Sequence, residues 1–308
     1  MLSSGAEGPV SGMDGRGGGM SATVNEDASG TPCEASNEGA TPARHHSPET
    51  VGGGRRLGWV GYALVVVAYL AIIQGLGAAI HVGNGGSKGQ FPTTDSMVHN
   101  ALTPIGASIV FVIAVITWLR WWPDVFRYRA PVQRWVRLVP ISMLVVAVAG
   151  INYGHLAHQQ TSLVLCLIVL GIFVGVGEEL MFRGIGVQVF RKAGISETRT
   201  ALFSSIIFGL VHVSNAISAG PQAILQAMIV ATSGFFFYLC LRVGGVILLP
   251  MLVHGLWDTS LISNLVGPTP GVSLGMVLLI LLQVVLIVVL LVRRHRINPA
   301  NRLQATPQ

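Results

Sequence analysis

The sequence predicts an all-α membrane protein, with about eight transmembrane helices that follow a disordered N-terminal tail. Hydrophobic residues make up 51% of the 308 residues and charged residues only 10%, well below the ~25% charged residues of soluble domains. From Leu57 onward, apolar runs recur at close to the ~20 residues that a helix needs to span a bilayer. Short connections with polar residues, Gly or Pro separate these runs.

The first 52 residues differ from the rest of the chain. They are rich in Gly, Ser, Thr, Glu and Pro, and they contain no apolar run long enough to form a core. They also lack the basic start, apolar middle and small-residue cleavage site of a secretory signal. We expect residues 1–52 to form a disordered tail that stays on the protein, in the cytoplasm.

The apolar runs predict eight spans, bounded by connections in which charges and turn residues gather. In chain order the spans are Leu57–Ile80, Leu102–Leu119, Trp135–Tyr153, Leu163–Phe190, Thr200–Ile217, Ala223–Leu241, Val246–Val266 and Leu274–Val292. This pattern divides the chain into the tail 1–52, N-terminal transmembrane helices in 53–159, a transmembrane core in 160–266, and a last helix with a basic C-terminal tail in 267–308.

The distribution of cations predicts the topology. Arg55 and Arg56 precede the first span, five arginines lie in the second connection, three cations in the fourth and Arg242 in the sixth, and Arg293, Arg294 and Arg296 follow the eighth span. The other connections carry a single cation, Lys88. Because cytoplasmic loops are enriched in Lys and Arg, we expect a multi-pass protein of the cell membrane with both termini in the cytoplasm. Cations beside spans, rather than in one patch, argue against nucleic-acid binding.

Ionisable residues inside the predicted spans gather in three short stretches. These are EELMFR from Glu178, FGLVH from Phe208 and HGLWD from His254. A charged side chain at the centre of a membrane helix costs about 2.5 to 3.5 kcal/mol on insertion scales, so such residues indicate a functional site. Residues four apart share a helix face, so Glu179 can pair with Arg183.

Depth along each helix decides whether the three stretches can meet. At ~1.5 Å per residue from the cytoplasmic ends of their helices, Glu178, His212 and His254 lie about 20, 18 and 16 Å deep. His254 and Asp258 share one face and can point into the same cavity, while Phe208 can pack against the His212 ring. We expect one layer of the bilayer to contain all of these side chains.

The three stretches in order, Glu-Glu-x-x-x-Arg, Phe-x-x-x-His and His-x-x-x-Asp, each on its own predicted span, resemble the intramembrane CAAX prenyl endopeptidase family. This family is also called the CAAX protease and bacteriocin-processing (CPBP, Abi) family. The resemblance covers roughly residues 160 to 265 and implies that the core 160–266 is catalytic. It implies an endopeptidase acting on a membrane-associated peptide or protein, with prenylated and bacteriocin-like substrates both open.

The resemblance also implies roles for individual residues. Glu178 would activate the hydrolytic water, and His212 would be its partner, orienting the water and passing a proton. His254 and Asp258 match the family's third motif, for which the implied role is stabilisation of the oxyanion. The other motif residues would orient the substrate or hold the structure: Glu179, Arg183 and Phe208.

Asp258 bears on whether the predicted site binds a metal ion, because the prenyl-processing enzymes have Asn at this position. An amide always donates a hydrogen bond, whereas a carboxyl group donates only when protonated. The set Glu178, His212, His254 and Asp258 is equally suited to a divalent ion such as Zn²⁺, and the family is often called a metalloprotease. We favour a metal-free Glu/His mechanism because the HExxH zinc signature is absent, with zinc as the alternative.

Two other classes of function remain as alternatives. Glu, His and Asp at mid-depth also describe the proton relay of a proton-coupled transporter, although no inverted repeats with paired broken helices are evident. A non-catalytic membrane scaffold or immunity protein would keep the same polar contacts for stability. For the protease, the expected partners are the lipid bilayer and a peptide or membrane-protein substrate, without nucleic acid.

Overall fold

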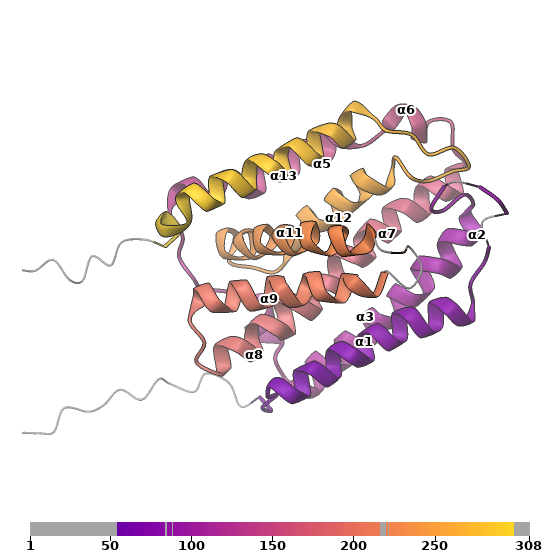
Figure 1. Ribbon diagram of the computed structural model, residues 1–308. Helices are drawn as coiled ribbons and strands as arrows, with labels where there is room; N and C mark the ends of the chain where they lie inside the picture. The colour runs from indigo at the N-terminus through magenta and orange to yellow at the C-terminus, as the bar shows by residue number, and fades with distance from the viewer. Residues whose placement is uncertain (1–53, 84, 88, 216–219, 221, 299–308) are drawn as a thin grey trace, which may run out of the picture. The chain divides into compact units, whose positions relative to one another are not determined.

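The computed structural model describes residues 54–298, except for residues 84, 88, 216–219 and 221 (Figure 1). Within this part of the chain every regular element is helical, and β pairing is limited to two isolated bridges, Phe91 with Val266 and Arg127 with Val246. The prediction of an all-α fold is therefore confirmed. The predicted tail, residues 1–52, lies outside the described residues.

One helix corresponds to each predicted span. These helices are α1 (Trp59–Ala79), α3 (Thr103–Leu119), α5 (Leu138–Gly150), α7 (Thr161–Glu179), α9 (Glu197–His212), α11 (Gln222–Gly244), α12 (Leu248–Ile262) and α13 (Leu274–Arg293). Short segments extend or connect them: α2 (Thr94–Met97), η1 (Val98–Leu102), α4 (Trp122–Phe126), η2 (Arg134–Arg137), α6 (Tyr153–Leu156), η3 (Leu180–Gly186), α8 (Val187–Lys192), η4 (Val213–Asn215) and η5 (Arg294–Arg296).

Five helical stretches among the described residues are long and apolar enough to cross a membrane: Trp59–Ala79, Thr94–Leu119, Thr161–Lys192, Ile224–Gly244 and Leu274–Arg296. The chain is thus a multi-pass membrane protein. By contrast, α5, α9 and α12 have 13, 16 and 15 residues. At 1.5 Å per residue they measure about 20 to 24 Å, less than the ~30 Å hydrocarbon core. The eight-span topology therefore stays a prediction.

The helices that carry the three motifs lie between two flanking pairs (Figure 1). In the centre, α7 packs on α12, and α11 packs on both α9 and α12. On one flank α1 packs on α3, which contacts α7; on the other α13 packs on α5, which contacts α12. Large apolar side chains on the flanking helices α1 and α13 are exposed. In a membrane these surfaces face hydrocarbon, which favours apolar contact.

Small residues let α7 and α12 approach closely. A Cβ atom at Gly175 would overlap the Met251 carbonyl oxygen, and one at Gly255 would come within 2.5 Å of the Gly171 carbonyl oxygen. Glycine at a membrane helix interface permits such backbone contact. His254 directly precedes Gly255, so the close approach brings the third motif against the first.

Helix α7 does not end at Glu179 but continues as the π-helical segment η3, Leu180–Gly186. All seven residues of η3 are buried. A π-helical segment inside an α-helix is rare and occurs frequently at functional sites. Here it follows the two motif glutamates directly and contains Arg183.

Polar contacts link the connection before η2 to the end of α8 and the start of α9. Tyr128, in the connection before η2, donates a hydrogen bond to Glu197 Oε2 at 2.6 Å, and Arg191 forms an ion pair with Glu197 Oε1 at 3.0 Å. Burial, and then the neighbouring Glu197 carboxylate, raise the pKa of Tyr128. The phenol therefore stays neutral and remains a hydrogen-bond donor.

Candidate active site

Three helices bring the four predicted catalytic side chains together. Glu178 lies at the end of α7, His212 is the last residue of α9, and His254 and Asp258 lie one turn apart in α12. Glu178 Oε2 is 3.9 Å from His212 Nε2 and 3.8 Å from His254 Nε2. His254 Nε2 is also 3.8 Å from Asp258 Oδ2.

The four side chains differ in their access to solvent or substrate. The exposed fractions of the Glu178, His212 and Asp258 side chains are 17%, 19% and 28%, whereas that of His254 is 3%. Glu178 Oε2 itself is buried and has no hydrogen-bond partner among the described residues. The site therefore has a partly open side with Glu178, His212 and Asp258, and a closed side with His254.

Glu179 and Arg183 form the pair that the i, i+4 spacing predicts. Arg183 Nη1 donates to Glu179 Oε1 at 2.9 Å, both side chains are fully buried, and Arg183 Nη2 donates to the Gly234 carbonyl oxygen at 2.7 Å. A buried arginine requires this kind of compensation, since an unpaired charge in the interior is costly.

Glu179 also contacts the third motif, which the sequence did not predict. His254 Nδ1 lies 2.8 Å from the same Glu179 Oε1. Because a carboxylate only accepts, Nδ1 is the protonated nitrogen and Nε2 faces Glu178 and Asp258. No spacing rule could reveal this contact, because Glu179 and His254 lie on different helices.

A backbone carbonyl orients the second imidazole in the same way. His212 Nδ1 is 2.8 Å from the carbonyl oxygen of Phe208, one turn earlier in α9. The carbonyl accepts, so Nδ1 carries the proton and Nε2 faces Glu178. Both imidazoles therefore present Nε2 to one carboxylate.

Aromatic rings enclose the charged groups. The Phe208 ring meets the His212 ring edge-on at 4.9 Å, and the Arg183 guanidinium lies over its face at 4.4 Å. Phe237 of α11 stacks on His254 with ring centroids 4.2 Å apart. The contact of Phe208 with His212 follows from their spacing, whereas Phe237 lies in no motif and its contact with His254 was not predicted.

The four donors suit a zinc ion in kind but not in spacing. Ligands of tetrahedral zinc at ~2.1 Å lie about 3.4 Å from one another, and the separations here are 3.8 to 3.9 Å. Among the described residues, no group of three or more His, Cys, Asp or Glu side chains is arranged to hold a metal ion. The alternative of a metalloprotease therefore gains no support from this geometry.

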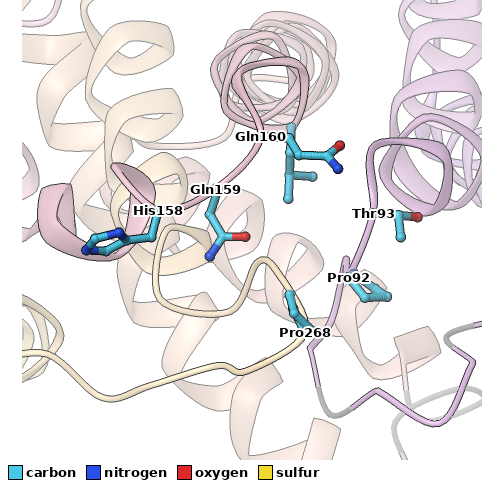
Figure 2. A pocket seen from close by; sticks show the side chains of 7 residues that line it. Pro92, Thr93, His158, Gln159, Gln160 and Pro268 are labelled. Atoms are coloured by element: carbon cyan, nitrogen blue, oxygen red, sulfur yellow. The ribbon is translucent and has the colours of Figure 1, made fainter.

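A pocket of about 280 Å³ lies apart from this cluster, and Figure 2 shows the side chains that line it. They come from the connection before α2, the segment between α6 and α7, the first turn of α7 and the loop after α12: Pro92, Thr93, His158, Gln159, Gln160, Leu163 and Pro268. None of these residues belongs to the three motifs. We assign this pocket no part in the candidate active site.

Fold and site together define a multi-pass membrane protein with ionisable side chains gathered among apolar helices, an arrangement that marks a functional site. Residues 159–260 match the model of the family described as Rce1-like, type II CAAX prenyl endopeptidase. This match confirms the resemblance to the CAAX prenyl endopeptidase family that the three motifs predicted, over residues 159–260. Neither the curated proteins nor the solved structures gave a match to the chain.

Proposed function

We propose that the protein is an intramembrane endopeptidase that hydrolyses a peptide bond of a membrane-associated peptide or protein, with water activated by Glu178. One observation carries this proposal. Two imidazole groups from two other helices present Nε2 to the Glu178 carboxylate at 3.8 and 3.9 Å. Peptide hydrolysis needs a base for water, an acid for the leaving amine and donors for the oxyanion.

Glu178 and His212 account for the proton transfers. Glu178 removes a proton from water, and the hydroxide formed attacks the carbonyl carbon of the scissile bond. The C–N bond then breaks as the amine receives this proton, either directly from Glu178 or through Nε2 of His212, whose Nδ1 is held by the Phe208 carbonyl oxygen. Both groups are partly exposed, so substrate can reach them.

His254 and Asp258 account for the oxyanion. His254 Nε2 lies within 3.8 Å of both Glu178 and Asp258, and as an imidazolium it can donate to the oxygen that becomes negative in the tetrahedral intermediate. Glu179 holds the imidazole ring through Nδ1, as a carboxylate does for histidine in other hydrolases. A protonated Asp258 would supply a second donor.

Purified full-length protein in liposomes tests the proposal with fluorescence-quenched peptides. One peptide carries a farnesylated C-terminal C-a-a-X sequence, a second is the same peptide without the lipid, and a third is a bacteriocin-type leader peptide. We expect cleavage of at least one peptide by the wild type and loss of that cleavage in Glu178→Gln. Equal cleavage by the variant, or no cleavage by the wild type, would contradict the proposal.

A further inference from the structure

Helix α1 lies outside the region that matches the family, yet it carries two buried tyrosines. Tyr62 and Tyr69 are each 2% exposed, and their spacing of two turns places them on one helix face. Neither hydroxyl group has a hydrogen-bond partner among the described residues. A buried polar group without a partner is costly, so each such group in a protein calls for a physical explanation.

Tyr62 packs at the C-terminal end of η3. Its ring meets the Phe190 ring edge-on at 5.8 Å. Its hydroxyl group lies against Gly186 at the end of η3, where a Cβ atom would overlap it. Tyr62 therefore packs into space that a glycine leaves open.

Tyr69 has different surroundings. Its ring meets Phe182 of η3 edge-on at 6.1 Å. Its hydroxyl group lies beside Ser108 of α3. Phe182 follows Glu178 by four residues, and Ile109, next to Ser108, lies against Gly177, the residue before Glu178. The proton of Ser108 is already donated to the Ile105 carbonyl oxygen at 2.7 Å. Ser108 therefore has no second proton to offer Tyr69.

Two buried groups without partners thus lie in the same region, and they are of complementary type. The Tyr69 hydroxyl group is a donor, and Glu178 Oε2 is an acceptor. His212 and His254 face the carboxylate from α9 and α12. Tyr69 approaches from α1, a third helix.

We propose that Tyr69 is a positioning residue of the active site, whose hydroxyl group donates a hydrogen bond to the Glu178 carboxylate through one water molecule. The bond fixes the orientation of the carboxylate that removes the proton from water. This inference rests on the proposed function of Glu178. It makes α1, outside residues 159–260, part of the catalytic machinery.

The test compares Tyr69→Phe with Tyr62→Phe in the full-length protein, using whichever quenched peptide the wild type cleaves. Tyr69→Phe keeps the ring against Phe182 and removes only the hydroxyl group. Because a hydrogen bond to a charged group is lost, kcat should fall roughly tenfold to hundredfold. KM should change less than about twofold, since Tyr69 acts through Glu178 and not on the substrate.

Tyr62→Phe is the matched control, because it removes an equally buried, equally unpartnered hydroxyl group from the same helix. It should keep the kcat of the wild type, and both variants should have similar midpoints of thermal unfolding. Ser108→Ala, which removes the other polar group beside Tyr69, should also keep kcat.

Several results would overturn the role of Tyr69. These are an unchanged kcat in Tyr69→Phe, an equal fall in Tyr62→Phe, or the same fall in Ser108→Ala. Glu178→Gln, measured alongside, distinguishes the two proposals: if it is inactive while Tyr69→Phe is fully active, the protease assignment stands and the role of Tyr69 fails. A wild type that cleaves no peptide would overturn both.

Discussion

The substitution Glu179→Gln separates a structural role of the buried cluster from a catalytic one. Glu179 Oε1 accepts from Arg183 Nη1 at 2.9 Å and from His254 Nδ1 at 2.8 Å. The exposed fraction is 0% for the side chains of Glu179 and Arg183 and 3% for that of His254. The amide can still accept one of these hydrogen bonds, but it cannot neutralise the guanidinium group.

The burial of the Glu179–Arg183 pair sets the expected loss of stability in Glu179→Gln. Removing one partner of a buried ion pair costs about 3 to 5 kcal/mol, because the other charge stays in the interior without compensation. Arg183 keeps its hydrogen bond to Gly234 and its contact with the Phe208 face, which places the expected loss at the lower end, about 3 kcal/mol. We expect the unfolding midpoint to fall clearly.

A double variant then tests the catalytic role. Glu179→Leu with Arg183→Met replaces the ion pair by apolar side chains of similar length, a change that is often neutral for stability. We expect the double variant to regain most of the stability while its turnover stays at least about tenfold below that of the wild type, because no carboxylate orients His254.

The assay is thermal unfolding in detergent together with peptide cleavage, and Lys192→Met serves as a control that breaks the more exposed ion pair with Asp124. The control should change stability by less than about 1 kcal/mol, as is usual for surface pairs. A double variant that regains full turnover would refute the positioning role of Glu179. Unchanged stability in Glu179→Gln would refute the energetic reasoning.

Three further predictions concern the base, the oxyanion and the topology. Glu178→Gln should lower turnover by about 10² to 10⁴ while the unfolding midpoint stays near that of the wild type; a folded variant with full activity would exclude Glu178 as the base. Asp258→Asn should keep or raise turnover near neutral pH, because an amide donates without being protonated. Stoichiometric zinc in the wild type, lost in this variant together with turnover, would instead establish a metal mechanism. A cysteine introduced at position 300 should be labelled only from the cytoplasmic side, and labelling from outside the cell would rule out the eight-span topology.

The sequence by itself determined the helical class, the position of each long helix and the three motifs. These features depend on local quantities, namely the length of apolar runs and the i, i+4 spacing. The same spacing predicted the pair of Glu179 with Arg183, which the structure contains at 2.9 Å. It also predicted the packing of Phe208 against His212.

Helix ends were less predictable. The predicted span Trp135–Tyr153 contains the shorter helix α5, Leu138–Gly150. Helix α9 begins at Glu197, before the predicted span Thr200–Ile217, and ends at His212. Hydropathy alone therefore overestimated the length of α5 and misplaced the start of α9. The helix ends depend on packing against neighbouring helices, which a run of apolar letters does not record.

Only the tertiary structure decided which groups meet across helices. His254 contacts Glu179, Phe237 stacks on His254, and Tyr69 packs against Phe182. Each of these contacts joins segments that are far apart in the chain, so it depends on how the helices rotate and approach one another. The close approach at Gly171, Gly175 and Gly255 sets the position of α12 on α7, and the orientation of His254 follows from that packing.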